Sequence, residues 1–196
     1  MSEQKYTAGL MSQCFWYQEF KAVASLYHEG VSFEEIRRQC VEENLLGTAN
    51  VARAKYNYGY LSTRVKAVGD DLLEIYLKSD IENQKIITLI SLMRVNRLFR
   101  EFVYEVYRDK LILGGGIIEK SDVNVFFSRK EQESETVASF KDTTVKTLKA
   151  QFVRFLFEAG LLSESGETIK PLLSFTLEDY LKQNDIYSYK AITGEV

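Results

Sequence analysis

Residues 32–68 read SFEEIRRQCVEENLLGTANVARAKYNYGYLSTRVKAV, and this stretch decides the fold class. Ser32 and Glu35 have the spacing of a capping box, in which each side chain accepts a hydrogen bond from the other residue's backbone N–H. We therefore expect a helix that begins at Phe33 and ends near Asn44.

A second helix is expected over residues 51–68, after a short turn at 45–50 that contains Gly47. Along this helix, apolar or small residues recur at alternating spacings of three and four, which indicates one buried stripe. Two helices joined by a short turn have the layout of a helix-turn-helix, whose second helix enters the major groove in DNA-binding proteins. The stripe consists of Val51, Ala54, Tyr58, Leu61, Val65 and Val68.

The rest of the chain also has helical periodicity, and it contains a single proline. A long helix is expected over 81–113, and the triple glycine at 114–116 ends it. A helix at 121–133, a helix at 143–159 and a short β-hairpin at 161–170 follow, which is the order of a winged helix. Further helices are expected over 12–29, 71–78 and 177–183.

The predicted fold is therefore mainly α, in a chain of 196 residues that is long enough to bury a sizeable core. Residues 1–78 form a helix-turn-helix-like N-terminal part, and residues 119–196 form a winged-helix-like C-terminal part with its β-hairpin. The long central helix within residues 79–118 is expected to join the two parts.

The distribution of charge is more informative than its total. A net charge of -3 excludes a protein that coats nucleic acid through bulk positive charge. Residues 51–68, however, carry four cations and no acid, and residues 141–160 carry a net charge of +2. Two basic helices in an acidic chain predict a small, oriented nucleic-acid footprint.

Six candidate DNA-binding residues lie on the helix 51–68, on the side opposite its apolar stripe or on the flanks of that side. Lysine and arginine can neutralise phosphates, and arginine and tyrosine can reach base edges or sugars. The alternative is a solvated face whose charges serve only solubility. The six residues are Arg53, Lys55, Tyr56, Tyr60, Arg64 and Lys66.

The helix 143–159 provides a second, smaller set of candidates. Val153 and Phe157 place apolar bulk on its outward side, so its C-terminal half is expected to be buried all round. Only the N-terminal half is then able to reach a groove. The candidates there are Thr143, Lys146, Thr147 and Lys149.

The sequence offers no signature of catalysis, of a cofactor or of a metal. Cys14 and Cys40 match no metal-binding spacing, and free thiols fit a reducing cytoplasm. His28 is the single histidine, and the glycines 114–116 lack a phosphate-binding frame. The nearly apolar stretch 86–93 is far shorter than the roughly 20 residues that span a bilayer. We therefore expect no enzyme, no cofactor, no metal, no small-molecule substrate and no membrane partner.

Three stretches together resemble the BrxA family, the small component of bacterial BREX phage-resistance systems. The first is YTAGL at 6–10, with EF at 19–20. The second is NRLF at 96–99, which leads into FVYEVY at 102–107, and the third is FLFEAGLL at 155–162. The resemblance implies a non-enzymatic DNA-binding role in a defence system that blocks phage replication and methylates host DNA.

The expected partner is thus double-stranded DNA, bound chiefly through its phosphates with little sequence specificity, and other BREX proteins are further expected partners. Replacing Arg53, Lys55, Arg64 and Lys66 with alanine should then remove most binding and leave the fold intact. The rival hypothesis is a protein–protein adaptor without direct DNA contact. Tyr56 and Tyr60 beside Arg53 motivate it, because tyrosine and arginine are enriched in interface hot spots.

Overall fold

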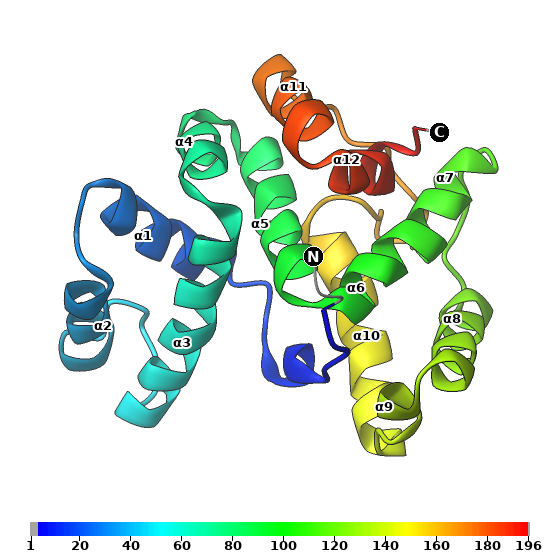
Figure 1. The fold of residues 1–196 in the computed structure, drawn as a ribbon, viewed down its shortest axis with the longest axis horizontal. Coiled ribbons are helices and arrows are strands. Elements are labelled where there is room, and N and C mark those ends of the chain that lie inside the picture. Colours follow the sequence, from blue (N-terminus) through cyan, green and yellow to red (C-terminus); the bar gives the residue numbers. More distant parts are fainter. Residues whose placement is uncertain (1–3, 196) are drawn as a thin grey trace.

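The N-terminal part of the chain is built on two capped helices. The structure, a computed structural model, describes residues 4–195 (Figure 1). The helix α2 (Phe33–Glu42) begins at Ser32, whose Oγ accepts from the Glu35 backbone N–H (3.2 Å). The helix α3 (Val51–Val68) has the expected bounds, and the Asn50 side chain caps its first turn. Between them lies an eight-residue connection, 43–50, which is longer than the ~3–4-residue turn of a helix-turn-helix.

Other helices surround this pair. A short 3₁₀ helix, η1 (Gly9–Ser12), precedes α1 (Tyr17–His28), and α4 (Asp70–Lys78) follows α3 directly. Figure 1 shows α1, α2 and α3 at one end of the molecule, with α4 above them. The first helix is therefore shorter than the expected span 12–29, because η1 and an extended segment occupy its beginning.

The prediction of a continuous helix over 81–113 is wrong, because the helix is interrupted at Asn96. The backbone of Asn96 is extended (φ -139°, ψ 110°), and its Oδ1 accepts from the Phe99 N–H (2.9 Å). Asparagine side chains compete in this way with helical hydrogen bonds and favour caps. The span is instead divided into α5 (Ile81–Val95), α6 (Arg97–Phe102), the π-helix η2 (Val103–Arg108) and α7 (Asp109–Ile112).

The winged-helix prediction for the C-terminal part is also wrong, since no β-strand forms anywhere in residues 4–195. Two isolated bridges, Leu162–Thr168 and Ile117–Glu167, replace the expected hairpin. The turn pairs only in part with itself, through Ile169 N–H to the Leu161 carbonyl and Ser163 N–H to the Glu167 carbonyl (both 2.9 Å). The Thr168 N–H donates instead to the Gly116 carbonyl (2.9 Å), so residues 116–118 compete for the remaining backbone groups. The helices of this part are α8 (Lys120–Glu133), α9 (Glu135–Ala138), α10 (Asp142–Glu158), α11 (Phe175–Asn184) and α12 (Ile186–Thr193).

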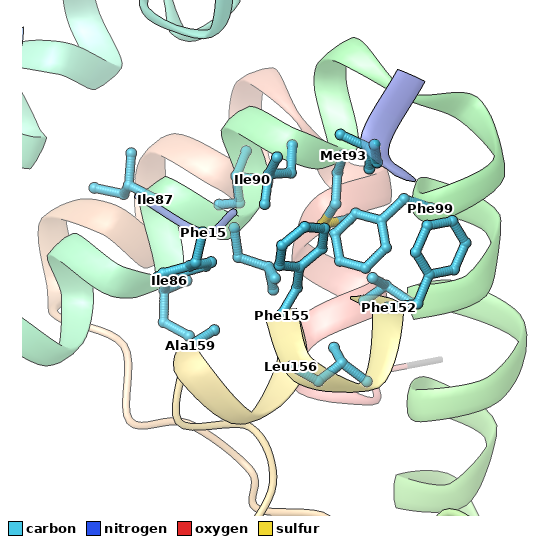
Figure 2. Close-up of a cluster of buried hydrophobic side chains, with 14 of the residues drawn as sticks. Phe15, Ile86, Ile87, Ile90, Met93, Phe99, Phe152, Phe155, Leu156 and Ala159 are labelled. Carbon is cyan, nitrogen blue, oxygen red and sulfur yellow. The ribbon is translucent and has the colours of Figure 1, made fainter. Parts of the chain in front are cut away.

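Aromatic rings form the centre of the core. Figure 2 shows Phe152 and Phe155 of α10 pointing toward Phe99 and toward the aliphatic side chains of α5. The Phe99 ring centroid lies 5.0 Å from that of Phe152 and 5.5 Å from that of Phe155. Such edge and tilted contacts add about 0.5–1.5 kcal/mol per pair beyond the burial of area. The C-terminal half of α10 is thus anchored to the middle of the chain.

A buried arginine connects α3 to the rest of the molecule. The Arg64 side chain is fully buried, and its Nε donates to Ser91 Oγ (2.9 Å) in α5. Its two Nη atoms donate to the carbonyl oxygens of Phe15 (3.0 Å) and Thr88 (3.3 Å). Burial lowers the pKa of Arg64 to about 9, so the guanidinium still carries its charge at neutral pH. These bonds join α3, α5 and the segment before α1.

We expect Arg64→Ala to lower the free energy of unfolding by about 3–5 kcal/mol, because it leaves a cavity and unpaired buried acceptors. Urea unfolding followed by circular dichroism measures this change. The exposed Arg53→Ala is the matched control and should change stability by no more than about 0.5 kcal/mol. Equal stability of the two variants would contradict a structural role for Arg64.

A second polar cluster holds the N-terminal segment against α6 and α8. Glu101 accepts hydrogen bonds from Tyr6 Oη (2.8 Å) and Arg97 Nε (2.7 Å), and Lys130 Nζ lies 2.8 Å from its Oε2. Burial alone would raise the pKa of Glu101, but the hydrogen bonds from Lys130, Arg97 and Tyr6 outweigh it and lower the pKa below 4.5. The ionised form of Glu101 therefore stabilises the folded protein.

Because the pKa of Glu101 is lower in the folded state, its contribution is present above pH 4.5 and is lost as the pH falls through the folded-state value. We expect Glu101→Gln to lower the free energy of unfolding at pH 7 by about 3 kcal/mol and to flatten its decline in acid. Urea titrations between pH 3 and pH 7 (roughly spanning carboxyl titration) test this. The exposed-pair variant Glu158→Gln should cost less than about 1 kcal/mol.

Candidate nucleic-acid interface

The outward face of α3 carries a group of cations and aromatic rings. Arg53, Lys55 and Lys66 are exposed, and none forms an ion pair with any residue between 4 and 195. Tyr56 and Tyr60 are half-buried, with their ring centroids 4.7 Å apart in an edge-to-face contact. The Arg53 guanidinium lies 5.2 Å from the Tyr56 ring centroid. Tyr56 therefore lies between the Arg53 guanidinium and the Tyr60 ring.

The tyrosines of this face are held by their neighbours. Tyr56 Oη forms a hydrogen bond with Ser12 Oγ of η1. Hydrogen bonding with Tyr56, together with burial, raises the pKa of Tyr60 above its ordinary value. The rings are thus ordered before any ligand arrives, which lowers the entropic cost of binding.

A cleft of about 380 Å³ lies between α3 and the N-terminal segment. Gln13 is buried in its wall and donates from Nε2 to the Gly9 carbonyl (3.0 Å), while its Oε1 has no hydrogen-bond partner within the described chain. The cleft gives the α3 face a concave, polar edge. Its lining includes Thr7, Leu10, Lys55, Tyr56, Tyr60, Thr63 and Asn96.

Two cations among the six α3 candidates, Arg64 and Lys66, have side-chain contacts with other helices that the sequence did not predict. Arg64 was expected on the flank of the outward face, and this is wrong, because its side chain is fully buried against α5. The four-alanine variant with Arg64 would therefore not leave the fold intact. Lys66 is exposed, but its Nζ lies 4.5 Å from the Phe33 ring centroid of α2. Three cations, Arg53, Lys55 and Lys66, remain available on α3.

Two of the four candidates on α10, Lys146 and Lys149, line a groove of about 730 Å³ between α8 and α10. Thr143, Lys146 and Thr147 are exposed, whereas Lys149 is half-buried and donates from Nζ to Asn124 Oδ1 (2.9 Å). Glu119, Glu131 and Asp142 also line this groove, which therefore has mixed charge. These three acids make the α10 surface a weaker anion-binding surface than that of α3.

The sequence suggested that the C-terminal half of α10 is buried all round, and this prediction is wrong. Phe157 is 48% exposed, and the Arg154 side chain lies in solvent, paired with Glu158 (2.5 Å between Nε and Oε1). Only one side of this half packs into the core, through Phe152, Phe155 and Leu156. Lys141, the residue just before α10, is an exposed cation that the sequence reasoning missed, because it placed the start of the helix at residue 143.

The 3₁₀ helix η1 and the residue after it connect the two basic helices. Ser12 contacts Tyr56 of α3, and the Gln13 carbonyl accepts from Gln151 Nε2 of α10 (2.7 Å). In Figure 1, α3 and α10 both begin near the lower edge, on either side of this short segment. No periodicity or motif in residues 9–13 indicates this bridging position.

These features define an all-helical arrangement of the described residues, in which α2 and α3 pack together and α3 presents three exposed cations. Within the described chain, no helix combines the length and the apolar character that crossing a bilayer requires. A crystal structure of an uncharacterized protein from Magnetospirillum magneticum has a similar fold, with a TM-score of 0.82 and 19% sequence identity. That similarity covers 98% of this chain and 100% of the other.

The sequence profile of the BrxA family matches residues 4–185. A relative named "BREX protein BrxA", from Bacillus cereus (strain H3081.97), is 33% identical over 185 residues, which cover 93% of this chain and 92% of the relative. The chain belongs to the BrxA family of BREX phage-defence systems. The resemblance noted in the sequence is therefore confirmed.

Proposed function

We propose that the protein binds double-stranded DNA as a non-enzymatic component of its BREX system, chiefly through backbone phosphates. One observation carries the proposal: in a chain of net charge -3, α3 presents three exposed cations and no acid. Phosphate neutralisation by lysine and arginine supplies essentially all of non-specific DNA affinity. A cationic helix surface without internal acids is suited to this role.

The position of α3 also supports contact with a groove. In helix-turn-helix proteins the N-terminal residues of the second helix approach the bases, and α3 places Arg53 and Lys55 in its first two turns. Its first turn is capped by Asn50, which fixes the direction of the helix start. Arg53 and Lys55 thus correspond in position to the residues that contact DNA in that motif.

Low sequence specificity follows from how the polar side chains are engaged. Reading a base edge requires a free, well-placed donor or acceptor. The Tyr56 hydroxyl is already bonded to Ser12, and the Arg53 guanidinium is stacked near the Tyr56 ring. Lysines, such as Lys55 and Lys66, act toward phosphates as mobile point charges. Most of the binding energy is therefore expected from the DNA backbone.

The helix α10 extends the same footprint. Lys146 and Lys149 add two cations near its N-terminal half, and the hydroxyls of Thr143 and Thr147 are exposed beside them. The segment that contains Ser12 sets the spacing between this surface and α3. Five cations on two helices correspond to a log–log salt slope of about -4 to -5, at roughly -0.9 per phosphate neutralised.

We expect the affinity for a 20-base-pair duplex (about two helical turns) to follow that slope in fluorescence anisotropy. The variant Arg53→Ala, Lys55→Ala, Lys66→Ala should weaken binding and reduce the slope to about -2, since each lost phosphate contact changes it by about 1. A salt-independent affinity, or no duplex binding at low salt, would contradict the proposal.

A charge-matched control separates the α3 surface from the net charge of the protein. Lys78, Lys170 and Lys182 are exposed cations elsewhere on the surface, each paired with a glutamate. Replacing these three with alanine changes the net charge equally and should leave most of the affinity and the slope. Equal losses in both triple variants would mean that only the total charge matters.

The rival function is a protein–protein adaptor whose contact face is Tyr56, Tyr60 and Arg53. The ordered rings beside a guanidinium favour it, since such groups dominate interface energetics. Co-purification with another BREX protein that survives nuclease digestion, and is lost in the Tyr56→Ala, Tyr60→Ala variant, is the outcome that the adaptor predicts. Loss of co-purification on nuclease digestion indicates DNA as the bridge instead.

A further inference from the structure

Large apolar side chains are exposed to solvent around the start of α11. Leu172 is 91% exposed and Phe175 is 84% exposed, while Leu173 between them packs against the core. Ile81, the first residue of α5, is 57% exposed. Clustered exposed apolar side chains on a soluble protein mark interaction sites. We call Ile81, Leu172 and Phe175 the α11 patch.

Hydrogen bonds bring the parts of the α11 patch together and hold them. The Ser174 N–H donates to Asn83 Oδ1 of α5 (3.0 Å), which ties the loop to the helix that begins with Ile81. The Ser174 hydroxyl also accepts from the Leu177 N–H and so caps α11. Phe175 is therefore the first residue of a capped helix. A partner would meet a surface that is already ordered, which lowers the entropic cost of binding.

The surroundings of the α11 patch are acidic. A hollow of about 470 Å³ lies between α4, the turn that leads into α5 and the start of α11, and Ser174 and Asp80 both line it. Asp71 and Glu74 add two more carboxylates from α4. The one cation in the lining is Lys78, and its Nζ is already paired with Glu74 (2.6 Å). The hollow thus keeps a negative charge after its internal pairing.

We propose that the α11 patch and this acidic hollow bind a segment of a partner protein that presents an apolar or aromatic side chain next to lysine or arginine. The apolar anchor would cover Leu172 and Phe175, and the basic side chains would enter the hollow beside Asp71 and Asp80. Charge complementarity selects this occupant, because the same carboxylates repel nucleic acid and anionic lipid.

The surface is separate from the proposed DNA-binding face. In Figure 1, α4 and α11 lie along the upper edge, whereas α3 and α10 begin near the lower edge. None of the residues of the α11 patch or its hollow belongs to α3 or α10. A partner bound here leaves α3 uncovered, so the protein is able to hold a partner and DNA at the same time.

A random dodecapeptide display library, selected on the immobilised full-length protein, tests the proposal. The enriched peptides should combine an aromatic or large aliphatic residue with neighbouring lysine or arginine. Synthesised copies should bind at least about tenfold more weakly to the Leu172→Ser, Phe175→Ser variant, since both substitutions remove apolar anchors. Asp71→Asn with Glu74→Gln should weaken the same peptides and reduce their salt dependence.

Matched controls make each outcome decisive. Leu113 is 82% exposed at the end of α7, and Leu113→Ser should leave peptide binding unchanged. Duplex DNA binding should be the same in the Leu172→Ser, Phe175→Ser variant as in the wild type, so failure here is separate from failure of the DNA proposal. Peptides that lack basic residues, peptides that bind the variant equally, or self-association that the variant abolishes would overturn the proposal.

Discussion

The buried guanidinium of Arg64 is the interaction on which the rest of the structure depends. Burying an unpaired charge in the core costs several kcal/mol, roughly, for each ion. The Arg64 guanidinium offsets this cost through three hydrogen bonds, to Ser91, Phe15 and Thr88. These partners belong to α5 and to the segment before α1. Because guanidinium donors point in fixed directions, these bonds fix the rotation of α3 about its axis and its position along that axis relative to α5. The outward position of Arg53 and Lys55 is a consequence.

This arrangement gives the molecule two electrostatic ends. The rotation of α3 directs its apolar stripe from Ala54 onward and Arg64 inward, and it leaves three cations outside that form no ion pair with any described residue. Val51, which the stripe was expected to include, is 53% exposed, because the first turn of α3 extends beyond the packed helices. At the other end, α4 and the turn between α4 and α5 place carboxylates such as Asp71 and Asp80 near the exposed apolar side chains at the start of α11. The net charge of -3 is a sum over the whole chain and describes neither surface. Partners of opposite chemistry are therefore kept apart on one small protein.

The sequence predicted the elements whose signals are local and missed those that depend on distant contacts. The bounds of α3 follow from the apolar periodicity that the sequence shows, whereas the Asn50 cap and the exposure of Val51 were not predicted. Arg64 lies at the border of that stripe on a helical wheel, and only the polar groups of α5 explain its burial. Asn96 ends α5 by capping the next helix, and the apolar periodicity over 81–113 gives no sign of this interruption. The turn at 161–170 has strand-like residues and pairs in part with itself, but residues 116–118 take up other backbone groups of the turn, and no strand forms within the described residues.

The N-terminal segment before α1, which contacts both α6 and α10, also constrains the order of folding. Tyr6 bonds Glu101, and Gln13 bonds Gln151, so residues made first during synthesis contact residues 95 and 138 positions later. Contacts of such long sequence separation carry a loop-closure cost and form late. On the ribosome, α1 to α3 are able to form early, but Ser12 and Gln13 have no support from α10 until most of the chain has emerged. Completion of the N-terminal part therefore waits for the C-terminal part.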